Sequence, residues 1–354
     1  MMKRHTALLL ILCCSLTMLA STVTANEDGR LQWRTLPPLP QPSGGQMAGV
    51  TNGTLLVIGG SYFNTPPWDG GSKIWLDTVY ALAPGASEWK LAGRLPHTLA
   101  YGVAVSVDES VIVIGGADGT RHYAEVFRLR YINGRLEQTP LPPLPQPNAN
   151  FGAALLGRTI CVAGGQGDPA ATAALKTLWS LDLDETNSRW KSLPSLPGAG
   201  RILPAAAAQD GGFFIAGGAE LSAGADGKAL RHYLHDTWRY QPARGWSQMA
   251  NTPGAIVAAP AIPYGQSHIF VFGGDDGSNA LRAAELKQNH PGFSRTILAY
   301  HTITNTWTNF ASMPASLVTT SAVQLNGEII IPGGEDRPAH RSGSVLATRL
   351  ALSK

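Results

Sequence analysis

Short apolar runs that end in a pair of glycines recur along the whole chain. The second glycines of these doublets are Gly60, Gly116, Gly165, Gly218, Gly274 and Gly334, in the contexts VIGG, VIGG, VAGG, IAGG, VFGG and IPGG. The intervals between them are 49 to 60 residues. Such a period is typical of repeat architectures with one supersecondary unit per repeat. The pattern predicts six copies of one unit.

Each unit reads as four short strands. Before the doublet there is an alternating or apolar strand pair, as in YGVAVSVDESVIVIGG. After it come a polar loop, a strand with an aromatic residue such as KTLWSL, and a Trp-containing strand that ends in a Pro-rich turn, as in SRWKSLPSLP. A lone sheet of this kind cannot bury both faces, so the units must stack around an axis. The sequence therefore predicts an all-β fold, a β-propeller.

The two ends of the repeat region complement each other. The N-terminal segment LQWRTLPPLPQP reads as a fourth strand that lacks the first three. The last unit, from about Leu317 to Leu352, has three strands and no Trp-containing strand. Pairing them would close the ring and remove exposed strand edges. We expect one six-bladed domain over residues 26–354.

The first 25 residues have the pattern of a secretory signal. Lys3 and Arg4 precede an apolar run from about Ala7 to Ala20, and small residues follow up to Ala25. We expect cleavage near Ala25 and a periplasmic or secreted mature protein. No second long apolar segment follows, so no membrane span is expected.

Charge and cysteine content narrow the possible partners. The chain has 27 basic and 24 acidic residues, and cleavage would remove Lys3 and Arg4 from the basic ones. A nearly neutral chain without a basic tract argues against nucleic acid or an anionic membrane surface as a partner. Cleavage would also leave Cys161 as the single cysteine, inside the apolar run TICVAGG. We expect it to be a buried small hydrophobe.

Polar residues collect in two kinds of loop that should share one face. In a propeller whose first strand lines the channel, the post-doublet loops and the inter-blade turns emerge together and border a central pocket, the default binding site. The cationic or ionisable candidates for substrate binding there are Arg121, Arg201, Arg282 and His340. His232 and His235 lie three residues apart on an extended strand and point to opposite faces, so no metal site is expected.

The repeat, with its aromatic and Trp-containing strands, resembles the Kelch repeat over nearly the whole mature chain. Within the last unit, the segment GEDRPAHRS looks like the Gly-Glu-x-x-Pro-Gly-x-Arg-Thr signature of bacterial N-acetylneuraminate epimerases, the sialic acid mutarotases. The matching residues are Gly334, Glu335, Pro338 and Arg341, with Ser342 conservative for Thr. Ala339 replaces the Gly of the signature, and Gly333 replaces the Asn usual before it. The position in the last repeat resembles the cyclically permuted branch of the family.

The resemblance implies an isomerase that interconverts the anomers of N-acetylneuraminate or a related sugar acid by general acid-base catalysis, without a cofactor. It assigns Glu335 as the proton acceptor and Arg341 as a substrate-binding residue. It lends no support to Arg121, Arg201, Arg282 or His340, which are rim candidates from the residues alone.

Several alternatives stay open at this point. A Kelch propeller can also be a non-catalytic module that binds a glycan or a protein on its rim, since a fold alone does not fix function. Glu220, with Arg231 downstream, is a rival to Glu335 as the base. The sequence does not decide which sugar is bound, or whether the protein forms a homodimer.

Overall fold

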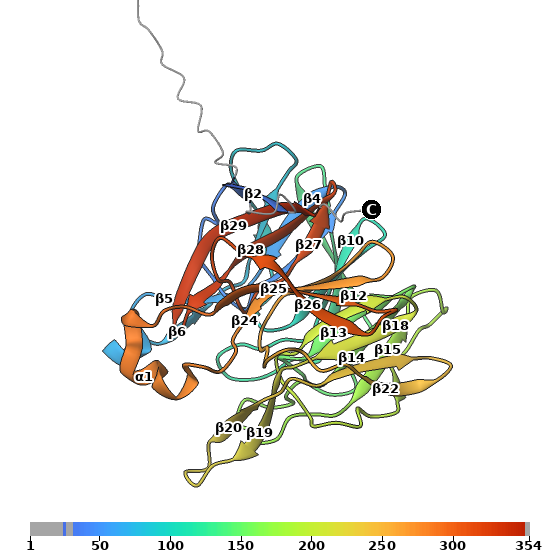
Figure 1. Cartoon of the computed structure of the whole chain (residues 1–354). Helices are drawn as coiled ribbons and strands as arrows, with labels where there is room; N and C mark the ends of the chain where they lie inside the picture. Colours follow the sequence, from blue (N-terminus) through green and yellow to red (C-terminus); the bar gives the residue numbers. More distant parts are fainter. Residues whose placement is uncertain (1–23, 26–30, 351–354) are drawn as a thin grey trace, which may run out of the picture.

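The computed structural model describes residues 24–25 and 31–350, and these residues form six antiparallel blades arranged as a propeller (Figure 1). Blade 1 contains β3 (Met47–Thr51), β4 (Thr54–Ile58), β7 (Thr78–Leu82) and β8 (Lys90–Arg94). Blade 2 contains β9 (Val103–Val107), β10 (Ser110–Ile114), β11 (Val126–Ile132) and β12 (Arg135–Leu141). Blade 3 contains β13 (Gly152–Leu156), β14 (Thr159–Ala163), β15 (Leu178–Asp182) and β16 (Lys191–Leu193).

The second half of the ring follows the same order. Blade 4 contains β17 (Ala205–Gln209), β18 (Gly212–Ala216), β21 (Thr237–Gln241) and β22 (Gly245–Met249). Blade 5 contains β23 (Ala261–Tyr264), β24 (His268–Gly274), β25 (Ser294–His301) and β26 (Thr306–Ser312). Blade 6 contains β27 (Val323–Leu325), β28 (Glu328–Arg337), β29 (His340–Leu350), β2 (Leu31–Leu36) and the two-residue β1 (Thr24–Ala25).

Three post-doublet loops carry further structure. Blade 1 bears the hairpin of β5 (Ser61–Phe63) and β6 (Lys73–Trp75), with the 3₁₀ turn η1 (Pro67–Asp69) between its strands. Blade 4 bears the hairpin of β19 (Ala219–Ala223) and β20 (Ala229–Tyr233). Blade 5 bears the insert of η2 (Ala280–Arg282), α1 (Ala283–Leu286) and η3 (Lys287–Asn289). These additions project from one side of the molecule in Figure 1.

The N-terminal strand completes the last blade, as predicted. β2 lies beside β29 in an antiparallel ladder of six residue pairs, from Leu31 opposite Leu350 to Leu36 opposite Val345. The predicted signal segment lies outside the described residues except for Thr24–Ala25, which pairs with β2. The signal therefore stays a prediction.

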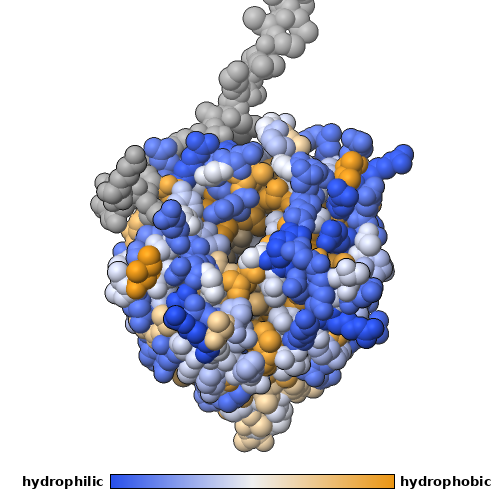
Figure 2. Space-filling model, turned by 90° about the vertical axis from the view of Figure 1, so that its right-hand side faces the viewer, coloured by the Kyte–Doolittle hydropathy of each residue, from blue (hydrophilic) through white to orange (hydrophobic). Residues whose placement is uncertain are grey.

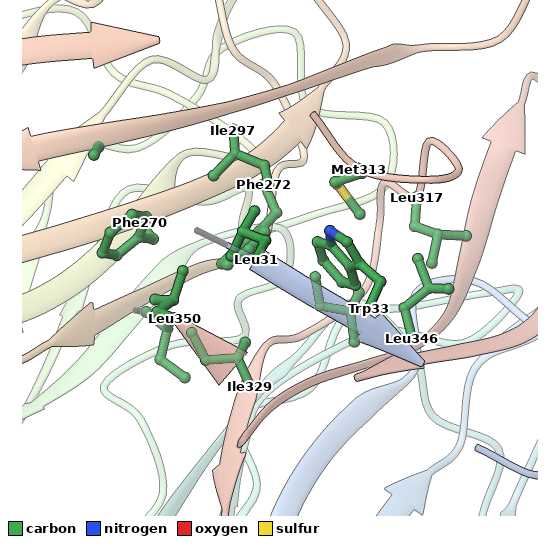
Figure 3. Close-up of a cluster of buried hydrophobic side chains, with 13 residues drawn as sticks. Leu31, Trp33, Phe270, Phe272, Ile297, Met313, Leu317, Ile329, Leu346 and Leu350 are labelled. Carbon is green, nitrogen blue, oxygen red and sulfur yellow. The ribbon is translucent and has the colours of Figure 1, made fainter. Parts of the chain in front are cut away.

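A buried hydrophobic cluster fastens this closing strand between blades 5 and 6 (Figure 3). Leu31 and Trp33 of β2 are 0% and 2% exposed and pack with Phe272 of β24 and Leu346 of β29. The rings of Trp33 and Phe272 meet edge to face at 6.4 Å. Burial of a Trp side chain contributes a large part of the local packing energy, so closure of the ring rests on these contacts.

The glycine doublets are required by backbone geometry. All twelve doublet glycines have positive φ, between 50° and 118°, a region in which side-chain-bearing residues are uncommon. At Gly59, a Cβ atom would also lie 2.0 Å from the carbonyl oxygen of Leu99. The doublet thus lets the chain turn sharply after the second strand while it packs against the next blade.

Six backbone hydrogen bonds form a closed ring around the channel, and we call its members the mouth ring. Each member donates its N–H to the carbonyl oxygen of the member in the preceding blade, at 2.6 to 2.9 Å, and each has φ between +51° and +70°. The members are Gly45, Tyr101, Asn150, Leu203, Ala258 and Thr319. The last bond, from Gly45 to Thr319, joins blade 1 to blade 6 and shows that the ring is closed.

The Pro-rich segments are inter-blade turns, and the tryptophans bind them. The indole N–H of a Trp donates to a carbonyl oxygen in the turn that precedes its blade, at 2.7 to 2.9 Å. These bonds run from Trp89 to Pro37, from Trp190 to Pro142, from Trp246 to Pro194 and from Trp307 to Ala250. The recurrent Trp of the repeat therefore links neighbouring blades.

Two further expectations can be compared with the structure. Cys161 is 1% exposed and unpaired, and burial raises the pKa of its thiol to about 12, which confirms a packing role. Among the described residues, no helix is long and apolar enough to cross a membrane.

Figure 2 shows the side away from α1, where the surface is hollowed near its centre and hydrophobic side chains lie inside a hydrophilic border.

Replacing Trp33 by Ala should lower the free energy of unfolding by about 3–5 kcal/mol, because the large-to-small change leaves a cavity between blades 5 and 6. Chemical denaturation measures the loss. Gln32→Ala is the matched control, since Gln32 lies on the same strand with an exposed side chain. Equal losses in the two variants would contradict the role given to this cluster.

Candidate functional site

The residue after each glycine doublet lies next to the mouth ring. In every blade it forms a backbone bridge with the residue that precedes the ring member. The six bridges are Gly44 with Ser61, Ala100 with Ala117, Ala149 with Gln166, Ile202 with Ala219, Val257 with Asp275 and Val318 with Glu335. The post-doublet loops and the inter-blade turns therefore share one rim, as predicted. A cavity of about 170 Å³ lies in the channel; mouth-ring members and first-strand residues such as Val103 and Ala153 line it, and Glu335 and Arg341 do not.

Glu335 occupies this rim position in blade 6, on the extended hairpin of β28 and β29. Its Oε1 accepts the N–H of Ala339 at 3.0 Å, and its Oε2 accepts the Thr319 hydroxyl at 3.4 Å. Oε2 also lies 2.5 Å from Nη1 of Arg341, and the Glu335 side chain is 15% exposed. The carboxylate is held in one orientation next to the mouth-ring member Thr319.

Arg341 faces Glu335 across the same hairpin. Its side chain is 5% exposed, its Nη2 donates to the Tyr101 hydroxyl at 3.3 Å, and its guanidinium carbon lies 5.4 Å from the centre of the Phe63 ring. Burial acts to lower the pKa of Arg341, but the charge of Glu335 and the contact with Tyr101 outweigh it, so the pKa is raised. Nε and Nη1 are both buried without a hydrogen bond among the described residues, although Nη1 lies 2.5 Å from Oε2 of Glu335. The guanidinium is therefore a buried cation held in place by its neighbours.

The Tyr101 hydroxyl contacts several other side chains of the site. It accepts a hydrogen bond from Nζ of Lys73 at 2.9 Å and lies 3.2 Å from the Ser61 hydroxyl. The Lys73 ammonium lies 4.7 Å from the centre of the Tyr101 ring and 5.2 Å from that of Trp75, within the range of cation–π attraction. The β5–β6 hairpin of blade 1 thus brings a second cation to the pair in blade 6.

Two glycines before β3 allow this close approach. A Cβ atom at Gly44 would lie 2.9 Å from Nη1 of Arg341, and one at Gly45 would lie 2.6 Å from Cε1 of Tyr101. Any side chain at these positions would displace the guanidinium or the phenol ring.

The departures from the epimerase signature fall where the backbone is left-handed. Ala339, in the position of the signature Gly, has φ +61°, and Gly333, in the position of the usual Asn, also has φ +61°. Glycine and asparagine adopt this region readily, whereas alanine does so at a cost of about 1–2 kcal/mol. The turn keeps the left-handed backbone that the signature glycine would favour. The N–H of Ala339 donates a hydrogen bond to the Glu335 carboxylate.

Arg201 is a correction to the sequence-based prediction. Its side chain is 0% exposed, and Nη1 and Nη2 donate to the two carboxylate oxygens of Asp236, both at 2.8 Å. Nη1 also donates to the Gly217 carbonyl oxygen at 3.0 Å. Burial acts to raise the pKa of Asp236, but the hydrogen bonds and charge of Arg201 outweigh it and lower the pKa. Arg201 joins blades 3 and 4 internally and offers no surface to a substrate.

The other rim candidates from the sequence contact residues other than Glu335 and Arg341. Arg121 is exposed and stacks over the Tyr123 ring at 5.0 Å, and Arg282 pairs with Glu285 in the blade 5 insert at 3.2 Å. The His340 ring lies 2.8 Å from Asp336 at the tip of the hairpin. Among the described residues, none of these candidates, nor Glu220 of β19, forms a hydrogen bond or ion pair with Glu335 or Arg341. Their roles in binding stay predictions.

Sequence reasoning missed Tyr101 and the three residues of the β5–β6 hairpin that join it, Phe63, Lys73 and Trp75. One signal was present for Tyr101. It stands in the same repeat position as Asn150, which in blades 1 to 4 is the second residue before the first strand. No motif marks the hairpin residues, because their position depends on the closed ring.

Within the described residues, no group of three or more His, Cys, Asp or Glu side chains is arranged to hold a metal ion. The site consists of a carboxylate, two cations, a phenol and aromatic rings. Such a set contains the chemical groups that can bind an anionic, hydroxylated molecule and exchange protons with it.

Comparison with known proteins supports the resemblance found in the motif. Residues 16–137 match the family model described as N-acetylneuraminate epimerase. The chain is 35% identical over 124 residues to the N-acetylneuraminate epimerase of Haemophilus influenzae, over 30% of this chain and 32% of that protein. It is 34% identical over 134 residues to the enzyme of the same name from Pasteurella multocida, over 32% and 35% of the two chains. The chain thus spans about a third of the curated epimerases it matches.

Longer but weaker similarities concern the fold. A Kelch-like protein of Aspergillus terreus, terF, is 25% identical over 319 residues, which cover 86% of this chain and 64% of that one. The solved structure titled "Structure of YjhT" superposes with a TM-score of 0.66 at 15% identity, over 88% of this chain and 96% of the other. These similarities support the propeller fold and the resemblance to N-acetylneuraminate epimerases. The cyclic permutation stays a prediction.

Asp236→Asn should lower the free energy of unfolding by about 3–5 kcal/mol at neutral pH, because it leaves the Arg201 cation buried without its anion. The depressed pKa of Asp236 means that its contribution is fully present above the unfolded value of about 4 and is lost as pH falls through the lower folded pKa. Denaturation at pH 7 and at pH 3 measures both effects. The gap between wild type and variant should narrow at pH 3, and a gap that widens there would contradict the assignment.

Proposed function

We propose that this protein is a mutarotase that interconverts the α and β anomers of N-acetylneuraminate or a related sialic acid. The observation that carries the proposal is the pairing of Glu335 with Arg341, 2.5 Å apart and largely buried, next to the mouth-ring member Thr319. The signature-like segment that holds both residues lies outside the matched residues 16–137, so two separate stretches of the chain resemble epimerases.

The chemistry of the substrate fits a carboxylate paired with a guanidinium. Sialic acid is a 2-keto sugar acid whose carboxylate is bonded directly to the anomeric carbon. A group that binds the substrate carboxylate therefore brings the anomeric hydroxyl close to its own neighbours. Arg341 has a planar guanidinium suited to a carboxylate. Its neighbour Glu335 is then positioned at the anomeric hydroxyl.

The reaction needs no more than proton transfer. Glu335 accepts the proton of the anomeric hydroxyl while an acid protonates the ring oxygen, and the ring opens to the keto form. Rotation about the bond next to the carbonyl carbon and closure in the reverse sense give the other anomer. General acid-base catalysis of this kind contributes about 10²- to 10⁴-fold in rate. Mutarotation proceeds slowly without help, so an acceleration of this size is sufficient.

The proposed place of action is the periplasm or the extracellular medium. This part of the proposal rests on the pattern of Lys3, Arg4 and the apolar run that follows them. It is independent of the site geometry.

Glu335→Gln should lower the rate of anomer exchange by about 10²-fold or more, since the amide cannot accept the proton. The α anomer is released in the sample by a sialidase, and its conversion is followed by NMR. Arg244→Gln is a control because Arg244 is exposed in the turn between β21 and β22, outside the post-doublet loops and the inter-blade turns. If the wild-type protein does not accelerate equilibration, the proposal fails and a non-catalytic binding propeller becomes the better description.

Arg341→Lys should raise KM by about tenfold or more. The ammonium keeps the positive charge but loses the planar pair of donors that matches a carboxylate. The same NMR assay, run at several substrate concentrations, gives KM. An unchanged KM would show that the substrate carboxylate is held elsewhere.

A further inference from the structure

Ring opening of a sugar acid requires two proton transfers in opposite directions. Glu335 accounts for the proton that leaves the anomeric hydroxyl, and the proton that reaches the ring oxygen needs its own donor. Both must act on one substrate, so the donor has to lie beside the same Arg341 that fixes the substrate carboxylate. Tyr101 meets this condition, since its hydroxyl accepts a hydrogen bond from Nη2 of Arg341 while Nη1 faces Glu335.

The backbone at Tyr101 is unusual for its residue type. Its φ is +60°, a left-handed conformation that is a genuine outlier for a bulky side chain. The mouth ring enforces it: the Tyr101 N–H donates to Gly45 at 2.7 Å, and its carbonyl oxygen accepts the Asn150 N–H at 2.9 Å. Outliers of this kind persist where the surroundings fix them, often at functional sites. The strained backbone sends the phenol over Gly45 toward blade 6.

Two cationic side chains contact the Tyr101 hydroxyl. Nζ of Lys73 lies 2.9 Å away and Nη2 of Arg341 lies 3.3 Å away, so two cations face one oxygen. Hydrogen bonds from cations stabilise an oxyanion more strongly than a neutral hydroxyl. The Ser61 hydroxyl, at 3.2 Å, is a third polar neighbour.

We infer that Tyr101 is the catalytic acid of the proposed mutarotation, with Lys73 as the residue that stabilises its anion. The inference rests on the proposed function. As Glu335 takes the anomeric proton, the bond between the anomeric carbon and the ring oxygen breaks, its electron pair stays on the ring oxygen, and Tyr101 gives that oxygen its proton. The open keto acid, a protonated Glu335 and a tyrosinate result. Closure on the other face reverses both transfers and restores both groups.

Tyr101→Phe tests the assignment with the least change of shape. The variant keeps the ring that meets Trp75 edge to face at 5.7 Å and loses only the hydroxyl. We expect kcat to fall by about 10²-fold or more while KM changes by less than about threefold. Tyr131→Phe, which removes a hydroxyl from β11 at the end of blade 2 away from the doublet, is the matched control and should keep the wild-type rate.

The outcomes separate this inference from the proposed function. If the wild type is inactive, both fail. If the wild type is active and Glu335→Gln is not, but Tyr101→Phe keeps a rate within about threefold of wild type, only the assignment of Tyr101 is overturned. Thermal unfolding of each variant confirms that the comparison concerns folded protein.

Lys73→Met provides a second, independent measurement, which carries the test if Tyr101→Phe does not fold. Lys73 lies on the β5–β6 hairpin, outside the four core strands of blade 1, and we expect the variant to lose about tenfold or more in kcat. Because Lys73 acts through Tyr101, the double variant should be no slower than Tyr101→Phe alone. Unchanged kcat in Lys73→Met, or losses that multiply in the double variant, would overturn the inference.

Discussion

The closed mouth ring of backbone hydrogen bonds is the constraint on which the rest of this structure depends. Each of its six bonds links one blade to the next, and the series closes only when Gly45 reaches Thr319. The left-handed φ that the ring imposes is tolerated by glycine and asparagine and is strained for other residues. The ring thereby fixes the radius of the channel and the direction of the side chains at its mouth, Tyr101 and Thr319 among them.

The candidate site lies at the seam where the ring closes. Lys73 and Tyr101 come from the first third of the chain and Glu335 and Arg341 from its end; Tyr101 and Arg341 are separated by 240 positions in the sequence. β5 and β29 are neighbours only because β2 completes blade 6 and blade 1 then follows it (Figure 1). The hydrophobic cluster around Trp33 and the candidate site are therefore coupled: contacts that hold the closing strand also hold the two halves of the site together.

The same seam explains how two partial resemblances concern one site. The matched segment, residues 16–137, contains Lys73 and Tyr101, whereas the signature-like hairpin contains Glu335 and Arg341. Neither stretch alone contains both the proposed base and the proposed acid. Across the seam, one guanidinium contacts both residues, with Glu335 at Nη1 and the Tyr101 hydroxyl at Nη2. A single planar cation thus sets the spacing between the two groups proposed to transfer protons.

The sequence by itself determined the repeat, the number of blades and the way in which the N-terminal strand completes the last one. These follow from local rules: glycine at positive φ, alternation along strands, and edges that must be paired. The resemblance of one short segment to the epimerase signature also marked Glu335 and Arg341 as candidates. Only the tertiary structure decided that Arg201 is buried against Asp236 and that Tyr101 points toward Arg341. Burial and side-chain direction arise from contacts between distant blades, which no local pattern encodes.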